Sequence, residues 1–265
     1  MLPIDVSHLI PRYYQIYDNL YNQIQEGKYA NGEKLPSEEK LCDLYQVSRG
    51  TIREAIKLLL QQGLLNRERG KGTFVSLNKI GQDLQQLMGF TELMNRNGMT
   101  ASAKILEVTV KDPNPKIKEI LMIPKGEQVV KVQRLRFGDK EPLIIEKSYF
   151  VRSIFQPLLK HDLENQSIYD ILYKETALRL GEATQDIEAT VAGPVESKAF
   201  GIEFGSPLLL MKRIIMLKDG SPFEYSEDYY RSDKLKFTVK TLPYEENQNN
   251  LSLVFTEETD QEGGE

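Results

Sequence analysis

Cysteine, histidine and tryptophan are scarce in this chain. Its 265 residues include one cysteine, Cys42, two histidines and no tryptophan. A single cysteine excludes an internal disulfide framework and is typical of a reducing compartment. With so few thiol and imidazole groups there is no metal-ligand cluster, and the HExxH and GxSxG catalytic motifs are absent. We therefore expect no bound metal and no cofactor.

Long hydrophobic runs are also missing. The most apolar stretch, between residues 208 and 216, is interrupted by Lys212 and Arg213 and is far shorter than a membrane span. The start of the chain, MLPIDVSHLIPRYY, lacks the charged and apolar regions of a signal peptide. The sequence predicts a cytoplasmic protein with no membrane partner, long enough for one large domain or two ordinary ones.

Basic residues are outnumbered by acidic ones over the whole chain, but the net charge is unevenly distributed. The formal net charge is −5, and residues 245–265 alone hold seven acidic side chains and no Lys or Arg. Residues 49–71, in contrast, hold six cations and two carboxylates. The negative net charge therefore comes mainly from the C-terminal tail, which we expect to be disordered, and it does not argue against a nucleic-acid partner.

The N-terminal region carries a helical pattern followed by a hairpin pattern. From Tyr13 apolar residues recur every three or four positions up to Gly27, and Ser37 and Ser48 stand where they would cap a second and a third helix. The segment LLNRERGKGTFV then reads as a strand, a glycine-containing tip and another strand. This order predicts a winged helix-turn-helix domain over residues 10–78.

The start of the third helix carries residues that a hydrophobic core does not require. Arg49 and Arg53 are four positions apart and share one face, opposite Ile52 and Ile56, with Thr51 between them. The first turn of a recognition helix enters the major groove, where arginine binds guanine O6 and N7. Cations that merely solvate an exposed helix face are the alternative, but the turn, the caps and the basic wing together favour DNA binding.

The string LPSEEKLCDLYQVSRGTIREAIKLLLQQGLLNRERGKGTFV resembles the DNA-binding domain of the GntR family of bacterial transcription regulators. The resemblance implies that Arg49, Thr51, Arg53 and Gly70 contact operator DNA. One residue departs from the family pattern, because Glu39 stands where the family usually has arginine, with Lys40 beside it. The predicted DNA-binding residues are Ser37, Lys40, Ser48, Arg49, Gly50, Thr51, Arg53, Arg69, Gly70, Lys71 and Gly72.

The second region contains an internal repeat. After a linker at residues 79–90, a short helix and a strand are expected, and residues 118–150 can then be laid over residues 198–230 with Arg134 on Arg213. Each copy reads as a short helix, a strand, a tight turn and a returning strand. Residues 91–244 are therefore predicted to form an α+β domain with a mostly antiparallel sheet flanked by helices.

Charged residues on these predicted strands suggest a binding site. Arg134 and Arg136 are two positions apart and point to the same face, and two guanidinium groups on one face match a phosphate or a carboxylate. Glu146 interrupts an apolar run on the returning strand, so cross-strand ion pairs on a solvated face are an equally open alternative. Glu224 and Tyr230 share a face of the last strand, and Ser167 precedes another predicted helix.

The segments RLR…PLIIEKSY, QSIYD, GSPLLLMKR and DGSPFEYSEDYYRSDKLKF resemble the UTRA effector-binding domain of HutC-type GntR regulators, whose fold is similar to chorismate lyase. Some members of that group sense amino-sugar phosphates. The resemblance implies an effector pocket lined by Arg134, Arg136, Glu146, Ser167, Glu224 and Tyr230, with the backbone of Gly89, Phe90 and Thr91 helping to hold the phosphate.

Two functions of different class follow from this reading. The first is a transcription regulator, most often a repressor in this family, that binds operator DNA as a homodimer and responds to a small anionic effector such as a phosphorylated sugar. The second is a lyase-like enzyme with an accessory DNA-binding arm. The lack of catalytic motifs favours the regulator and predicts that the chain is not an enzyme.

Overall fold

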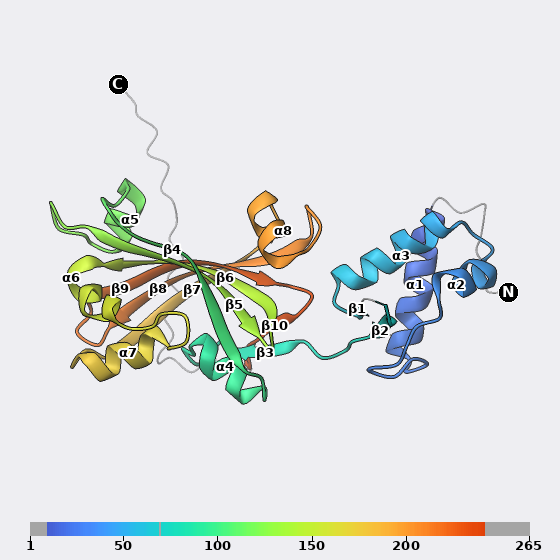
Figure 1. Ribbon diagram of the computed structural model, residues 1–265, viewed down its shortest axis with the longest axis horizontal. Coiled ribbons are helices and arrows are strands. Elements are labelled where there is room, and N and C mark those ends of the chain that lie inside the picture. Colours follow the sequence, from blue (N-terminus) through green and yellow to red (C-terminus); the bar gives the residue numbers. More distant parts are fainter. Residues whose placement is uncertain (1–9, 69, 242–265) are drawn as a thin grey trace, which may run out of the picture.

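The computed structural model describes residues 10–68 and 70–241, so the predicted tail at 245–265 lies outside the described residues. Figure 1 shows two bodies joined by the chain that follows β2. The first body contains α1 (Arg12–Gln25), α2 (Glu38–Tyr45), α3 (Arg49–Gln61), β1 (Leu65–Glu68) and β2 (Gly72–Val75). The second contains β3 (Ile80–Asp83), α4 (Phe90–Arg96), β4 (Ala101–Lys111), α5 (Pro115–Ile120), β5 (Val129–Gly138), β6 (Glu141–Val151), α6 (Arg152–Phe155), the 3₁₀ helix Gln156–Lys160, α7 (Ile168–Glu175), β7 (Leu180–Val191), α8 (Pro194–Phe200), β8 (Pro207–Leu217), β9 (Pro222–Arg231) and β10 (Leu235–Thr238).

The helix starts of the first body follow the predicted caps. The Ser37 Oγ accepts a hydrogen bond from the Lys40 N–H at 3.3 Å, and the Ser48 Oγ accepts one from the Thr51 N–H at 3.2 Å. Each serine therefore satisfies an amide that has no partner within its own helix. The helix-turn-helix prediction from the two serines is confirmed.

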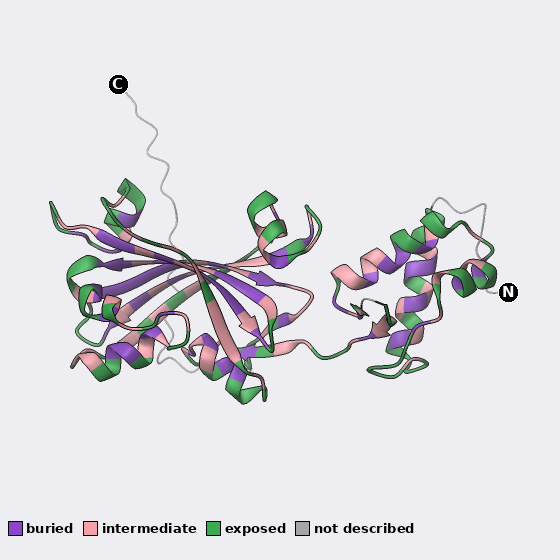
Figure 2. Cartoon of the chain, viewed as in Figure 1, coloured by how far each residue is buried: buried purple, intermediate pink, exposed green. Residues whose placement is uncertain are grey.

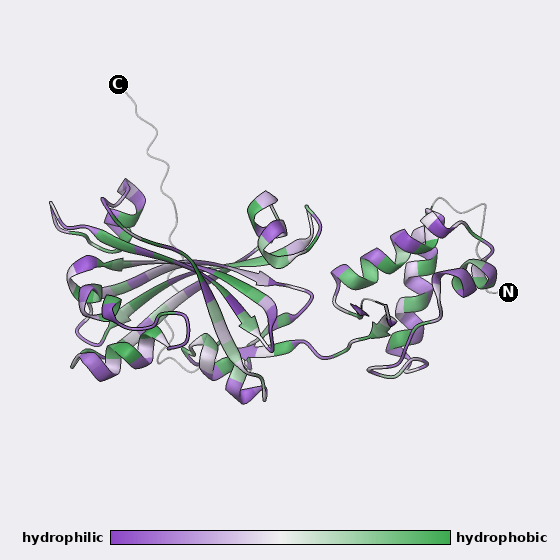
Figure 3. Ribbon diagram, viewed as in Figure 1, coloured by the Kyte–Doolittle hydropathy of each residue, from purple (hydrophilic) through white to green (hydrophobic). Residues whose placement is uncertain are grey.

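One hydrophobic cluster holds the three helices and the wing together. Apolar residues of α1, such as Leu20, and of α3, such as Ile52, are fully buried in it, and Val75 of β2 closes one side. Cys42 packs against the same cluster as a half-buried free thiol. The buried stripes are visible along the inner sides of the helices in Figure 2, and the same stripes are hydrophobic in Figure 3.

A six-stranded antiparallel sheet forms the second body, in the strand order β4-β5-β6-β9-β8-β7. The two repeated segments are its central hairpins, β5–β6 and β8–β9, and the second strands of the two hairpins meet in the middle of the sheet, where β6 pairs with β9. Helices α4, α6 and α7 cover one face of the sheet, while α5 and α8 cover the other (Figure 1). The predicted α+β fold with flanking helices is confirmed.

The segment 79–90, assigned to a linker above, contains a strand. β3 pairs in parallel with β10 near the end of the described chain, with Ile80 opposite Leu235. Helix α4 begins at Phe90, a few residues after β3 ends. The chain that arrives from the wing is therefore anchored to the second body immediately before the helix that covers its sheet.

The two bodies touch near the C-terminal end of α3. Gly63 adopts a φ of +73°, and a Cβ atom at this position would lie 1.9 Å from the carbonyl oxygen of Asp233, so a glycine is required here. Lys57 Nζ lies 2.6 Å from a carboxylate oxygen of Glu203, which adds an ion pair between α3 and the loop after α8. No helix in the described part of the chain is long and apolar enough to cross a bilayer.

Candidate functional site

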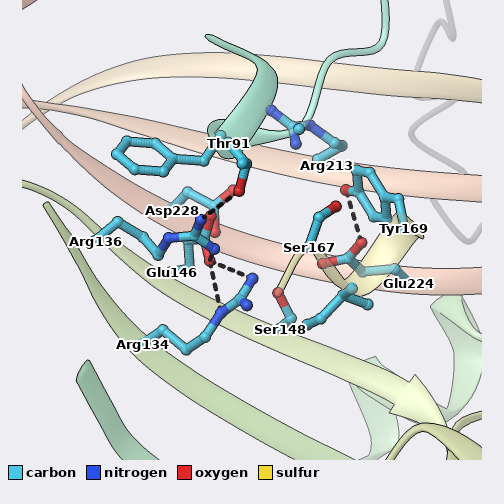
Figure 4. Close-up of a pocket in the computed structure, with 13 residues that line it drawn as sticks. Thr91, Arg134, Arg136, Glu146, Ser148, Ser167, Tyr169, Arg213, Glu224 and Asp228 are labelled. Atoms are coloured by element: carbon cyan, nitrogen blue, oxygen red, sulfur yellow. Dashed lines mark hydrogen bonds and ion pairs between the residues drawn. The ribbon is translucent and has the colours of Figure 1, made fainter. Parts of the chain in front are cut away.

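A polar cavity lies between the sheet and the helices α4 and α7 (Figure 4). Its volume is about 30 Å³, which is room for about two water molecules. The cavity is narrow because long charged side chains from four strands extend into it. It is lined by Gly89, Phe90, Thr91, Arg134, Arg136, Glu146, Ser148, Ser167, Ile168, Tyr169, Arg213, Glu224 and Asp228.

The two arginines predicted from β5 share one carboxylate. Arg134 Nη2 lies 2.7 Å from Glu146 Oε2, and Arg136 Nη1 lies 3.3 Å from the same oxygen. Both arginine side chains are less than a tenth exposed, and Arg134 also donates to the carbonyl oxygen of Leu163 at 3.0 Å. The cross-strand ion pair that the sequence left open is therefore present. It forms part of a cavity wall and does not lie on a solvated face.

Helix α4 is held over the cavity by Arg136. The Arg136 Nη2 donates to Thr91 Oγ1 at 3.3 Å, and the guanidinium lies 4.5 Å from the centre of the Phe90 ring. Arg136 Nε is buried and has no hydrogen-bond partner among the described residues. Burial lowers the pKa of Arg136, although the neighbouring Glu146 opposes that shift. An unpaired donor in a cavity wall is available to a ligand acceptor.

Two further carboxyl groups line the opposite side. Burial raises the pKa of Glu224, which accepts a hydrogen bond from the Tyr169 hydroxyl at 3.0 Å. Burial also raises the pKa of Asp228 to about 7, while its Oδ2 accepts a hydrogen bond from Ser226 at 3.0 Å. Because Asp228 is only partly ionised near neutral pH, the three arginines of the cavity outweigh its carboxylates, and the burial of Glu224 acts in the same direction. Such a site favours an anion.

Most of the predicted effector residues meet in this cavity. Tyr230 is the exception, because its ring packs edge-on against Phe237 and its hydroxyl lies 3.5 Å from Arg213 behind the wall. The sequence reasoning did not select four polar lining residues, although two signals in the sequence indicated some of them. Arg213 is the repeat counterpart of Arg134, and Asp228 is four positions from Glu224 on the same strand face. The four residues are Ser148, Tyr169, Arg213 and Asp228.

The predicted reading face of α3 is exposed. Arg49 and Arg53 point away from the core that buries Ile52 and Ile56, and Thr51 Oγ1 lies 2.9 Å from Ser48 Oγ at the helix start. Gly50 adds no side chain to this turn, so the backbone stays accessible. This arrangement places both arginines on the solvent side of α3, as insertion into a groove requires.

Carboxylates of α2 partly neutralise this face. Arg53 Nε donates to Glu38 Oε2 at 2.9 Å, and Arg67 on β1 donates to the other oxygen of Glu38 at 3.3 Å. Arg49 Nη2 lies 3.8 Å from Glu39, the residue that departs from the family pattern. These pairs are largely exposed, so DNA phosphates can replace them at little cost.

The tip of the wing also remains open. Gly70 has a φ of +76°, and a Cβ atom there would have no neighbour within 4 Å. Lys71 lies 2.9 Å from Glu68 and is three-quarters exposed, whereas Arg69 lies outside the described residues. Ser37, Lys40 and Gly72 lie on the same body. Their contact with DNA stays a prediction.

Comparison with known proteins identifies both regions. Residues 12–75 match the family of bacterial regulatory proteins named gntR, and residues 96–236 match the UTRA domain. The chain is 34% identical over 228 residues to the transcriptional repressor NagR of Bacillus subtilis, which covers 86% of this chain and 93% of that protein. It is 30% identical over 227 residues to the probable fructoselysine utilization operon repressor of Escherichia coli, with the same coverage.

Solved structures share the fold. The crystal structure of PhnF from Mycobacterium smegmatis has a TM-score of 0.61 at 21% identity, and it covers 86% of this chain and 100% of its own. The possible transcriptional regulator YydK of Bacillus subtilis has a TM-score of 0.53 at 28% identity, covering 88% of this chain and all of its own. The matching families and relatives are regulators rather than enzymes, which excludes the lyase-like alternative.

Proposed function

Because the chain belongs to the GntR family of bacterial transcription regulators and carries a UTRA domain, we propose that it is a repressor whose operator binding is released by a small anionic effector. The observation that carries the proposal is the buried cavity walled by three arginines and roofed by α4, the helix nearest the connector. An effector that occupies it would act where the two bodies join.

A phosphorylated sugar fits the cavity best. Arginine forks match phosphate oxygens in two-pronged fashion, and the hydroxyls of Thr91 and Ser167 stand at the same wall. Glu224 and Tyr169 supply acceptors and donors suited to sugar hydroxyls. The name of one relative, the probable fructoselysine utilization operon repressor, refers to a sugar joined to an amine, so an amino-sugar phosphate is the first candidate.

Binding must widen the cavity. Pockets that enclose small ligands measure about 300–1,000 Å³, whereas this one holds about 30 Å³. We expect α4 to be the element that moves, because it is only seven residues long. The Arg136–Thr91 hydrogen bond ties it to the wall, and a ligand that competes for the Arg136 donors would break this tie. A phosphate that takes over the Arg136 donors would release α4 and, through β3, the connector to the wing. Effector and operator then weaken each other's binding by linkage.

A homodimer is part of the proposal. A single winged helix makes too few base contacts for operator specificity, and dimers of such domains read two half-sites. We expect the second body to supply the dimer contact, as its sheet is the larger folded unit. Light scattering of the full chain with and without a palindromic operator measures the state directly, and a monomer in both conditions would contradict this part of the proposal.

The effector proposal is tested by melting and gel-shift measurements on the full chain. Glucosamine 6-phosphate and glucose 6-phosphate should raise the melting temperature and release operator DNA, whereas glucosamine and glucose should do neither. The Arg136→Lys variant keeps a positive charge beside Glu146 but loses the fork, so it should bind operator and respond poorly to sugar phosphates. Lys147→Met, on the other face of β6, is the matched control. Binding of unphosphorylated sugars alone would refute the phosphate class and leave the regulator assignment intact.

A further inference from the structure

The two central hairpins are copies of one another, and the cross-strand register shows where they differ. In the first copy Arg134 of β5 stands directly opposite Glu146 of β6. In the second copy Arg213 of β8 stands directly opposite Ser226 of β9. The repeat therefore keeps the arginine and replaces its carboxylate partner by a serine.

The replacement leaves Arg213 buried without an ion pair. Arg134 lies 2.7 Å from its carboxylate, whereas no Asp or Glu among the described residues forms an ion pair with Arg213, which is 6% exposed. Its contacts are neutral: Nε donates to Gln185 at 3.0 Å, and Nη2 lies 3.5 Å from the Tyr230 hydroxyl and close to the sulfur of Met211. A buried charge without a direct ion pair costs stability, and the Asp228 and Glu224 carboxyls act on Arg213 only from beyond ion-pair distance, so folding alone does not explain this residue.

The guanidinium nevertheless stays charged. Burial opposes the charge, but the Tyr230 and Tyr169 phenols and the Asp228 and Glu224 carboxyls raise the pKa of Arg213 above its ordinary value. Arg213 therefore brings to the cavity wall a charged side chain that forms no direct ion pair with the described carboxylates.

Arg213 is separate from the first arginine pair. β6 and β9 lie between β5 and β8, so the backbones of Arg134 and Arg213 are three strand spacings apart, about 14 Å. Figure 4 shows Arg134, Arg136 and Glu146 as one group, with Arg213 apart from them. One phosphate cannot bind optimally to both ends.

We propose that Arg213 is a specificity-determining residue that donates to an oxygen acceptor, a carbonyl or a carboxylate, carried by the effector at the end remote from its phosphate. This inference rests on the proposed sugar-phosphate effector. A planar fork binds a carbonyl or carboxylate oxygen more strongly than a hydroxyl, because its charge is retained and its donors are fixed in direction. The effector would supply the counter-group that Ser226 does not.

The ligand test compares three probes that share a phosphate. Glucose 6-phosphate has no such acceptor, N-acetylglucosamine 6-phosphate has a carbonyl, and 6-phosphogluconate has a carboxylate. Calorimetry on the full chain should show at least one acceptor-bearing probe binding about tenfold more tightly than glucose 6-phosphate. Arg213→Met should abolish that preference and leave the affinity for glucose 6-phosphate within about threefold. Lys212→Met, the neighbour on the opposite face of β8, should behave as wild type.

Two results of this experiment overturn the inference. The first is the absence of a preference for acceptor-bearing probes in the wild-type protein, or the persistence of that preference in Arg213→Met. The other is an equal loss of all three probes in Arg213→Met, which would make Arg213 a phosphate ligand. If the wild-type protein binds none of the probes, the proposed effector class is wrong. The role of Arg213 is then decided by the melting temperatures of the ligand-free variants.

The stability test uses the repeat as its own control. Arg134→Met removes one partner of a buried pair and should lower the melting temperature of the ligand-free protein, whereas Arg213→Met removes an unpaired buried charge and should leave it unchanged or raise it. A fall in Arg213→Met as large as the fall in Arg134→Met would show that Arg213 is structural, and would overturn the inference whatever the probes do.

Discussion

Arginine–glutamate pairs occur in both domains of this molecule, and they differ in how far they are exposed to solvent. On the predicted DNA-reading face Arg53 lies 2.9 Å from Glu38, and the Arg53 side chain is 64% exposed. In the cavity Arg134 lies 2.7 Å from Glu146, and its side chain is 8% exposed. Water screens the first pair and leaves it exchangeable, whereas the second pair is fixed by the cost of separating buried charges. Similar distances therefore belong to an exchangeable pair on the predicted reading face and to a buried pair in the cavity wall.

The largest effect should come from breaking the buried pair. Glu146→Ala leaves Arg134 and Arg136 without their carboxylate, and the loss of one partner of a buried pair costs about 3–5 kcal/mol in the free energy of unfolding. Chemical denaturation followed by circular dichroism measures it. Glu188→Ala, which removes the exposed partner of Lys212 on the same sheet, should leave the transition almost unmoved. An equal loss of unfolding free energy in the two variants would contradict the claim that the buried pair contributes more to stability than the exposed pair.

The next effect concerns DNA binding and not stability. Arg49→Ala and Arg53→Ala should each weaken binding to a specific operator about 5- to 150-fold, because a two-pronged contact to guanine is lost. The melting temperature should stay unchanged, since both side chains are exposed. Gel shifts on operator and scrambled duplexes measure the losses. An equal loss on both duplexes would mean that the arginine contacts phosphate and reads no base.

A smaller effect is expected at the wing. Lys71→Ala should weaken binding to all duplexes alike, because an exposed lysine on a hairpin tip contributes a phosphate contact without sequence information. The slope of log affinity against log salt concentration should fall by about one unit. Fluorescence anisotropy at several salt concentrations gives the slope. A sequence-dependent loss would place Lys71 in a groove.

The smallest effect should come from Glu38, a half-buried carboxylate at the start of α2. Glu38→Gln should shift the melting temperature by less than about 4 °C, because its pairs with Arg53 and Arg67 are solvated. It should also strengthen binding to operator and scrambled duplexes alike, since a negative charge is removed beside cations that meet phosphates. Weaker binding would show that Glu38 positions Arg53 for its contact.

Local patterns account for what could be predicted about the fold. The caps at Ser37 and Ser48, the apolar stripe that includes Ile52 and the glycine-containing wing are set within a few residues of chain, so the winged helix follows from short-range order. The repeat predicted the two hairpins, because each copy contains its own turn. Arg134, Arg136 and Glu146 were also found in this way, since their shared face follows from the alternation of a strand.

The remaining features depend on contacts between distant segments. That β6 pairs with β9, that α4 and α7 roof the same cavity and that β3 pairs with β10 are decided by packing and not by local preference. The sequence alone therefore determined the elements and their faces, and it supplied the prediction of which side chains read DNA. Only the tertiary structure decided that Tyr230 does not line the cavity and that Arg213 forms no ion pair with a carboxylate in the described part of the chain, because burial and ion pairing depend on neighbours that the chain brings together on folding.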